Sequence, residues 1–231
     1  MEEFVIAGKP VLILSKQEVD AEIEQAKLDQ RDANFAGKTL KAFSLMGKDL
    51  DNGVNLENSL IIGNVFFGDC SIKGNLNLAG AAIDGSLNFS RGKLIGNLLM
   101  EKAWIGQTAN MAGINITGSV AMAQARVNGF VSFSQAVILG NLDLRQIESQ
   151  DYCQNDLKIK GDIILKSAQI NGALDLSGAQ ITGDIIIDNA LVRQNLITRD
   201  TQTQGIISLK DAIYNKGLAD FTNVAPEKII Q

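Results

Sequence analysis

The groups that could do chemistry in this chain of 231 residues are mainly carboxylates, because the chain contains no histidine. Triad hydrolases, histidine-ligated zinc sites and histidine pH switches are thereby excluded. Asp162 and Asp184 lie 22 residues apart and share one position of the repeat described below, where a stacked pair could share a proton or bind a cation. They fall on outward positions, where solvated aspartate is ordinary, and residues 103–141 hold a single charge, Arg126. We therefore expect no catalytic residue, no metal site and no cofactor, and predict that the chain is not an enzyme.

The two cysteines give no sign of a disulfide framework. Cys70 and Cys153 are 83 residues apart and form no Cys-x-x-Cys pair. Reduced, buried thiols are the simpler expectation, with Cys70 as a small core residue.

The charge of the chain and its N-terminal residues limit the partners and the location that we expect. The net charge is −5 and no basic cluster is present, so direct nucleic-acid binding is not expected. Met1-Glu2-Glu3 is acidic where a secretory signal needs positive charge, and the apolar run 11–14 is too short to span a membrane. We expect a cytoplasmic protein with no membrane span.

An eleven-residue repeat dominates the chain and must position any site. Its unit is G-x-L-x-L-x-x-A-x-I-x, with glycine at positions 63, 74, 85, 96, 118, 129, 140, 161, 172, 183 and 205. Apolar residues alternate with period two within each unit, which is typical of strands, and such long self-similarity predicts a solenoid. Large inward residues recur in steps of five and six, and small residues such as Ala81, Ala103 and Ala125 precede many of them.

Two stretches carry a family resemblance. Ala33-Asn34-Phe35-Ala36-Gly37 and Ala219-Asp220-Phe221-Thr222-Asn223 match A-(D/N)-(L/F)-x-x, the unit of pentapeptide-repeat proteins. The chain resembles this family over roughly residues 33–224, with a body that is a variant of alternating five- and six-residue steps. The resemblance implies an all-β fold, a right-handed parallel β-helix that forms a four-sided solenoid with 22 residues per coil. About nine coils at a strand spacing of ~4.8 Å would give a rod of roughly 40 Å.

The rival geometry is a flat solenoid with eleven residues and two faces per coil. We rank it second because so thin a coil normally needs disulfides to hold its faces together.

The ends of the chain depart from the repeat, which predicts three regions. Residues 1–32 form a cap, with a strand around residues 4–14, a capping box from Ser15 to Glu18, and a helix from Glu18 to about Arg31. Residues 33–224 form the solenoid, and residues 225–231 form a C-terminal tail. A helix of this kind covers the unpaired edge of the first coil or, alternatively, binds a partner. The apolar stripe of the helix comprises Val19, Ile23, Ala26 and Leu28.

The repeat loses its register once, in residues 145–158. The step from Leu144 to Ile159 is fifteen residues where the alternation requires sixteen, which predicts a shortened or remodelled turn. The irregularity is either drift in a repeat or a recognition feature on a uniform wall.

A few outward residues form the candidate interaction surface. Trp104 should point outward with Ala82 and Arg126 as neighbours one coil away, and lone exposed tryptophans are common at interfaces. Ile164 and Ile186 are apolar at outward positions, which suggests self-association or coverage by the C-terminal segment. Tyr152, in the irregular segment, completes the set.

Three functions follow as hypotheses. The first is a non-enzymatic scaffold that binds another, unknown protein or a second copy of itself as a homodimer. The family resemblance implies a second, a DNA mimic that modulates gyrase or protects topoisomerases, although such a mimic needs on the order of twenty aligned carboxylates and the central coils offer none. The third is a carbohydrate-binding or carbohydrate-active β-helix.

Overall fold

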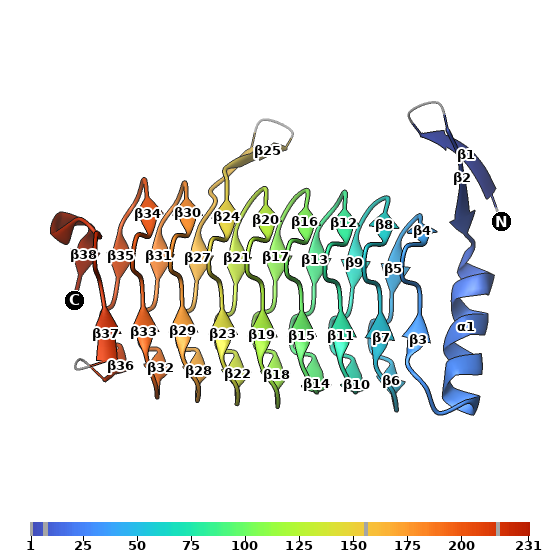
Figure 1. Ribbon diagram of the computed structural model, residues 1–231, viewed down its shortest axis with the longest axis horizontal. Helices are drawn as coiled ribbons and strands as arrows, with labels where there is room; N and C mark the ends of the chain where they lie inside the picture. Colours follow the sequence, from blue (N-terminus) through green and yellow to red (C-terminus); the bar gives the residue numbers. More distant parts are fainter. Residues whose placement is uncertain (1, 7–8, 155–156, 216–217) are drawn as a thin grey trace.

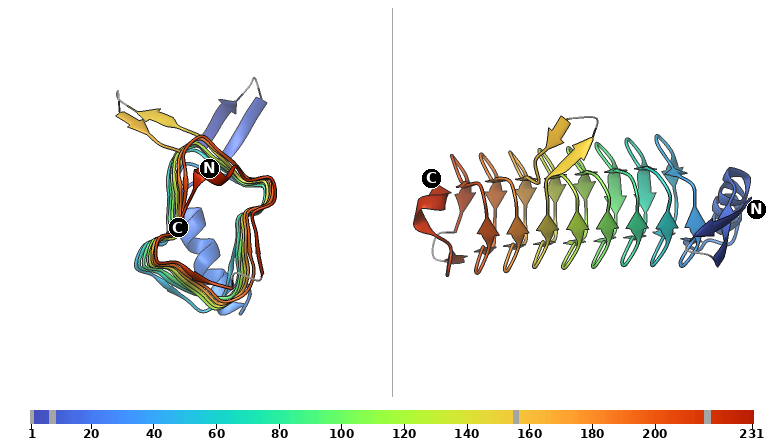
Figure 2. Two further views of the ribbon diagram at one scale, coloured as in Figure 1. Left: turned by 90° about the vertical axis from the view of Figure 1, so that its left-hand side faces the viewer. Right: turned by 90° about the horizontal axis from the view of Figure 1, so that it is seen from above.

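A computed structural model describes residues 2–6, 9–154, 157–215 and 218–231, and side chains for 12–151, 160–215 and 218–231. Short strands stack from coil to coil into a rod with four parallel sheets and about nine coils (Figures 1 and 2). The fold is therefore an all-β solenoid with one short helix at its N-terminus, as expected.

Four sheets, labelled A to D, form the walls, and each coil visits B, A, C and D in turn. Sheet A contains β1 (Glu2–Ile6), β2 (Lys9–Leu14), β4 (Thr39–Leu40), β8 (Leu60–Ile61), β12 (Ala82–Ile83), β16 (Trp104–Ile105), β20 (Arg126–Val127), β24 (Glu148–Ser149), β30 (Gln180–Ile181) and β34 (Gln202–Thr203). Sheet B contains β3 (Ala33–Asn34), β7 (Val54–Asn55), β11 (Leu76–Asn77), β15 (Leu98–Leu99), β19 (Val120–Ala121), β23 (Leu142–Asp143), β29 (Leu174–Asp175), β33 (Leu196–Ile197) and β37 (Ala219–Asp220).

Sheets C and D complete the coil. Sheet C contains β5 (Phe43–Ser44), β9 (Val65–Phe66), β13 (Leu87–Asn88), β17 (Ala109–Asn110), β21 (Val131–Ser132), β27 (Ile163–Ile164), β31 (Ile185–Ile186), β35 (Ile207–Ser208) and β38 (Ile229–Ile230). Sheet D contains β6 (Asp49–Leu50), β10 (Ser71–Lys73), β14 (Lys93–Ile95), β18 (Asn115–Ile116), β22 (Val137–Ile138), β28 (Gln169–Ile170), β32 (Leu191–Val192) and β36 (Ile213–Tyr214).

Strand pairing fixes the length of one coil. Leu76 pairs with Leu98, and Ile83 pairs with Ile105, each 22 residues along the chain. The four-sided solenoid is thus confirmed, and the flat solenoid is wrong because strands eleven residues apart lie on different walls. The first coil is one residue shorter, since Thr39 pairs with Leu60.

The core consists of side chains that alternate inward along each strand. Leu78, Ile83, Phe89, Leu94 and Met100, which the repeat places inward, are all buried. The small residues expected beside them are fully buried as well: Ala81, Ala103 and Ala125. Four phenylalanine rings form a row of edge-to-face and tilted contacts along the first coils, with centroids 5.2, 5.6 and 5.4 Å apart: Phe35, Phe43, Phe67 and Phe89.

Close approach of neighbouring coils explains the recurring glycine. A Cβ atom at Gly96 would lie 2.2 Å from the carbonyl oxygen of Gly74 in the preceding coil, well inside any normal contact. A side chain at this corner would therefore force two coils apart.

The N-terminal cap is a hairpin followed by a helix. Strands β1 and β2 pair antiparallel, and Ile13 of β2 pairs with Thr39 of β4, which extends sheet A. Helix α1 (Lys16–Leu28) begins with the expected capping box, in which the Ser15 hydroxyl accepts a hydrogen bond from the Glu18 backbone N–H. The helix starts and ends earlier than the predicted range of Glu18 to about Arg31.

One residue of the predicted apolar stripe is wrong. Val19, Ile23 and Ala26 are buried, but Leu28 is 78% exposed. Nine residues separate Leu28 from Val19, which places it about 180° around the helix from the buried face.

The last residues join the rod. Ile229 and Ile230 form β38, which pairs with β35 after a 3-10 turn, η2 (Pro226–Lys228). The segment expected as a tail thus contributes the last strand of sheet C.

The irregular segment contains an insertion, so of the two predicted alternatives the remodelled turn is right and the shortened turn is wrong. Glu148 of β24 pairs with Gln180 of β30, 32 residues along the chain instead of 22. The insertion carries an antiparallel arm of two strands, β25 (Tyr152–Gln154) and β26 (Leu157–Ile159), which projects from the rod between sheets A and C (Figures 1 and 2). Ile159 belongs to this arm, and Ile163 and Leu165 are the next apolar residues buried in the coil.

Candidate interaction surface

Trp104 lies on the outer wall of sheet A. It is 37% exposed, and its pairing neighbours are Ala82 and Arg126, as the repeat predicts. Gly106 lies close beneath its ring: a Cβ atom there would be 3.1 Å from Cη2 of the indole. The glycine therefore lets the ring lie along the wall.

A shallow hollow of about 700 Å³ opens beside Trp104. The Gln124 side chain donates a hydrogen bond of 2.8 Å to the Gln146 amide oxygen, and Arg126 Nε lies 3.1 Å from Glu148 Oε2. These contacts tie side chains of successive coils together. The lining residues are Lys102, Ala103, Trp104, Gln124, Arg126, Gln146, Glu148, Gly178 and Gln180.

The other candidate residues lie elsewhere on the rod. Ile164 and Ile186 pair with each other on sheet C, where both are half-buried at outward positions. The arm leaves the rod between this wall and sheet A, so the structure does not bring the isoleucines together with Trp104. Tyr152 belongs to β25, and its side chain lies outside the described residues.

Asp162 and Asp184 stack as expected, and their carboxylates are used to link coils. Asp162 Oδ1 accepts a 2.7 Å hydrogen bond from the Asp184 backbone N–H, and Asp184 Oδ1 accepts one of 2.9 Å from Ile206. Asn75 Oδ1 makes the same contact with the Asn97 backbone N–H at 2.8 Å. Within the described part of the chain, no cluster of three or more Cys, Asp or Glu side chains could hold a metal ion.

Cys70 is a core residue, as predicted. Its side chain is buried, and this burial raises the pKa of the thiol to about 12. A neutral thiol is a poor nucleophile.

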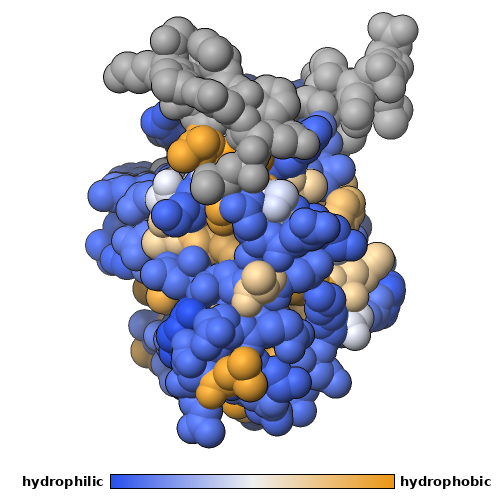
Figure 3. Space-filling model, turned by 90° about the vertical axis from the view of Figure 1, so that its right-hand side faces the viewer, coloured by the Kyte–Doolittle hydropathy of each residue, from blue (hydrophilic) through white to orange (hydrophobic). Residues whose placement is uncertain are grey.

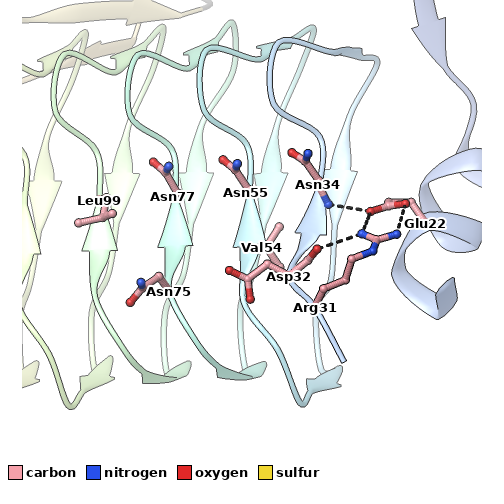
Figure 4. Close-up of a pocket in the computed structure, with 9 residues that line it drawn as sticks. All are labelled: Glu22, Arg31, Asp32, Asn34, Val54, Asn55, Asn75, Asn77 and Leu99. Carbon is pink, nitrogen blue, oxygen red and sulfur yellow. Dashed lines mark hydrogen bonds and ion pairs between the residues drawn. The ribbon is translucent and has the colours of Figure 1, made fainter. Parts of the chain in front are cut away.

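A second hollow, of about 570 Å³, which the repeat does not predict, lies where the cap meets sheet B (Figure 4). The Arg31 guanidinium donates hydrogen bonds of 2.5 and 3.1 Å to the two Glu22 carboxylate oxygens, and lowers the pKa of that carboxyl group. Glu22 also accepts a 2.8 Å hydrogen bond from the Asn34 backbone N–H, which ties α1 to the first coil. Its lining residues are Glu22, Arg31, Asp32, Asn34, Val54, Asn55, Asn75, Asn77 and Leu99.

A row of asparagines forms the floor of this second hollow. Asn34, Asn55 and Asn77 follow one another along sheet B, and each side-chain oxygen accepts the backbone N–H two residues later, at 3.0 to 3.1 Å. The recurring apolar-Asn pair was the sequence signal for this row. Its position beside the cap depends on where α1 docks, which no repeat specifies.

The comparisons with known proteins return nothing: no protein family, no curated protein and no solved structure matches this chain. Family membership therefore stays a prediction from the resemblance. No helix among the described residues is long and apolar enough to cross a membrane.

Proposed function

We propose that the rod is a non-enzymatic cytoplasmic scaffold that binds another protein through the sheet A wall around Trp104. The observation that carries this proposal is the large aromatic side chain at 37% exposure beside a hollow on a regular wall. Partly exposed tryptophans next to arginine are typical centres of protein interfaces, because they bury a large apolar area at little entropic cost.

The charge distribution favours this function over DNA mimicry. A mimic needs rows of carboxylates that repeat the phosphate charges. In three columns of this rod, acids pair with cations one coil away; Asp51 lies 2.7 Å from Lys73, and Asp69 lies 2.7 Å from Arg91. Glu148 pairs in the same way with Arg126. Such alternation neutralises the columns that a mimic would keep negative.

Affinity capture with matched variants tests the proposal. A partner recovered by crosslinking to the parent protein should be bound at least about tenfold more weakly by Trp104→Ala. Ile95→Ala is the control, since Ile95 is 41% exposed on sheet D, across the rod from sheet A. Both variants should melt like the parent. Full recovery of the partner by Trp104→Ala, or an equal loss of the partner with Ile95→Ala, would contradict a binding site on this wall.

A gyrase assay separates the two hypotheses. Titration of the protein into a supercoiling reaction, with and without a fluoroquinolone, should change nothing if the protein is a scaffold for another partner. Inhibition or drug protection would replace this proposal with the DNA-mimic function.

A further inference from the structure

At the N-terminal end of the rod, the three sheets other than sheet A end in strands with only one neighbour each: β3, β5 and β6. Sheet A is extended there by β2, and α1 packs beside β3 of sheet B, but β5 is the terminal strand of sheet C. The view along the rod shows the helix crossing only part of the first coil (Figure 2). The cap therefore leaves β5 uncovered by a strand.

The hydrogen bonds of β5 show which backbone groups face outward. The N–H groups of Phe43 and Leu45 donate to the carbonyl oxygens of Asn64 and Phe66 in the next coil, at 3.2 and 2.8 Å. Because neighbouring residues of a strand point their backbone groups to opposite sides, those of Ser44 point away from the rod. Such an edge can pair with a further extended strand.

An apolar hollow of about 410 Å³ lies beside this edge. Ile13, Leu14, Val19 and Ala42 supply apolar surface from β2, α1 and the loop before β5. Figure 3 shows this end of the rod, where apolar surface appears among hydrophilic side chains. The hollow is therefore suited to an apolar side chain carried by the added strand. The remaining lining residues are Ser15, Lys16, Asp20, Lys41 and Ser44.

The charges around the hollow favour an acidic occupant. Lys16 lines it together with a single acid, Asp20. The carboxylate of Asp20 lies 3.4 Å from the ammonium group of Lys48, so a second cation offsets it. A carboxylate next to the apolar side chain would complement this surface.

We propose that the β5 edge binds an extended, acidic-apolar segment of another protein as an added strand of sheet C. Main-chain hydrogen bonds to Ser44 supply the pairing, and the hollow and Lys16 select the side chains. The site is separate from the Trp104 wall, and the two proposals fail independently.

The probe is a short fluorescein-labelled peptide in which leucine alternates with threonine and aspartate flanks the centre. Saturable binding to the full chain is expected by fluorescence anisotropy. Ser44→Pro should weaken it at least about tenfold, because proline removes the outward N–H group without touching the bonds to β9. Ser44→Ala and Trp104→Ala should bind like the parent.

Modified peptides keep the test independent of how well Ser44→Pro folds. Two peptides are compared, one N-methylated at the odd-numbered amides and one at the even-numbered amides. Only one of the two should lose binding, because only one edge of the peptide pairs with β5. Lysine in place of aspartate should weaken binding about tenfold. No saturable binding, or equal binding of both methylated peptides, would overturn the proposal. A parent that sediments as a dimer while Ser44→Pro is a monomer would also overturn it, and would make a second copy the occupant.

Discussion

Small inward side chains let the narrow coil close. Ala103 is fully buried between the walls, and we expect Ala103→Leu to lower the free energy of unfolding by about 1–3 kcal/mol through overpacking. Urea unfolding measures the change. Ala121→Leu is the matched control, because Ala121 faces outward in β19 and pairs there with Leu99 of the preceding coil. Equal losses in the two variants would contradict the inward role of Ala103.

The Cys70 thiol gives a pH prediction. Its pKa is about 12 in the folded chain, whereas an ordinary cysteine ionises at ~8.5. The stability contributed by the neutral, buried thiol is therefore complete below a pH of ~8.5 and is lost as the pH rises toward about 12. In a Cys153→Ser background, a thiol reagent at mildly alkaline pH should label Cys70 only after denaturant is added. Rapid labelling of the folded protein would contradict this prediction.

At the scale of elements, the sequence predicts what repeats and little of what interrupts the repeat. Strands, coil length and the capping box follow from spacing and from local hydrogen bonding. The arm cannot be predicted in this way, because an insertion of ten residues shifts an eleven-residue repeat by the same amount as the deletion of one residue. Leu144 to Ile159 therefore looks like a short turn until the pairing of Glu148 with Gln180 is known.

The same arithmetic predicts that the arm is dispensable for folding. Deleting residues 151–160 joins Gln150 to Gly161, as Asn128 is joined to Gly129 one coil earlier, and restores a 22-residue coil. We expect a thermal midpoint within a few degrees of the parent, although the deletion removes Asp151, whose side chain accepts a 2.9 Å hydrogen bond from the Thr182 hydroxyl. Circular dichroism melting measures it. A broad or non-cooperative transition would show that the arm holds the two halves of the rod together.

At the scale of the whole molecule, the four-sided coil decides which residues meet. Residues 22 apart share a column, so the contact between Trp104 and Arg126 could be predicted from spacing alone. The two hollows beside the cap could not, because they depend on where the cap docks and on which sheet edges it covers. The row at Asn34 and the edge at Ser44 both lie beside α1, and each gains its shape from an element outside the repeat.

The last prediction is that the cap protects the rod from self-association. Ile23 is buried where α1 covers the first coil, so Ile23→Asp places a charge against the core and should cost about 2–4 kcal/mol of unfolding free energy. Displacement of the helix would uncover strand edges and the first layer of the core, and we expect concentration-dependent association by light scattering. Leu28→Asp, on the same helix at 78% exposure, should remain monomeric and equally stable. If Ile23→Asp stays monomeric and loses no stability, the end of the rod is closed by something other than the seating of α1.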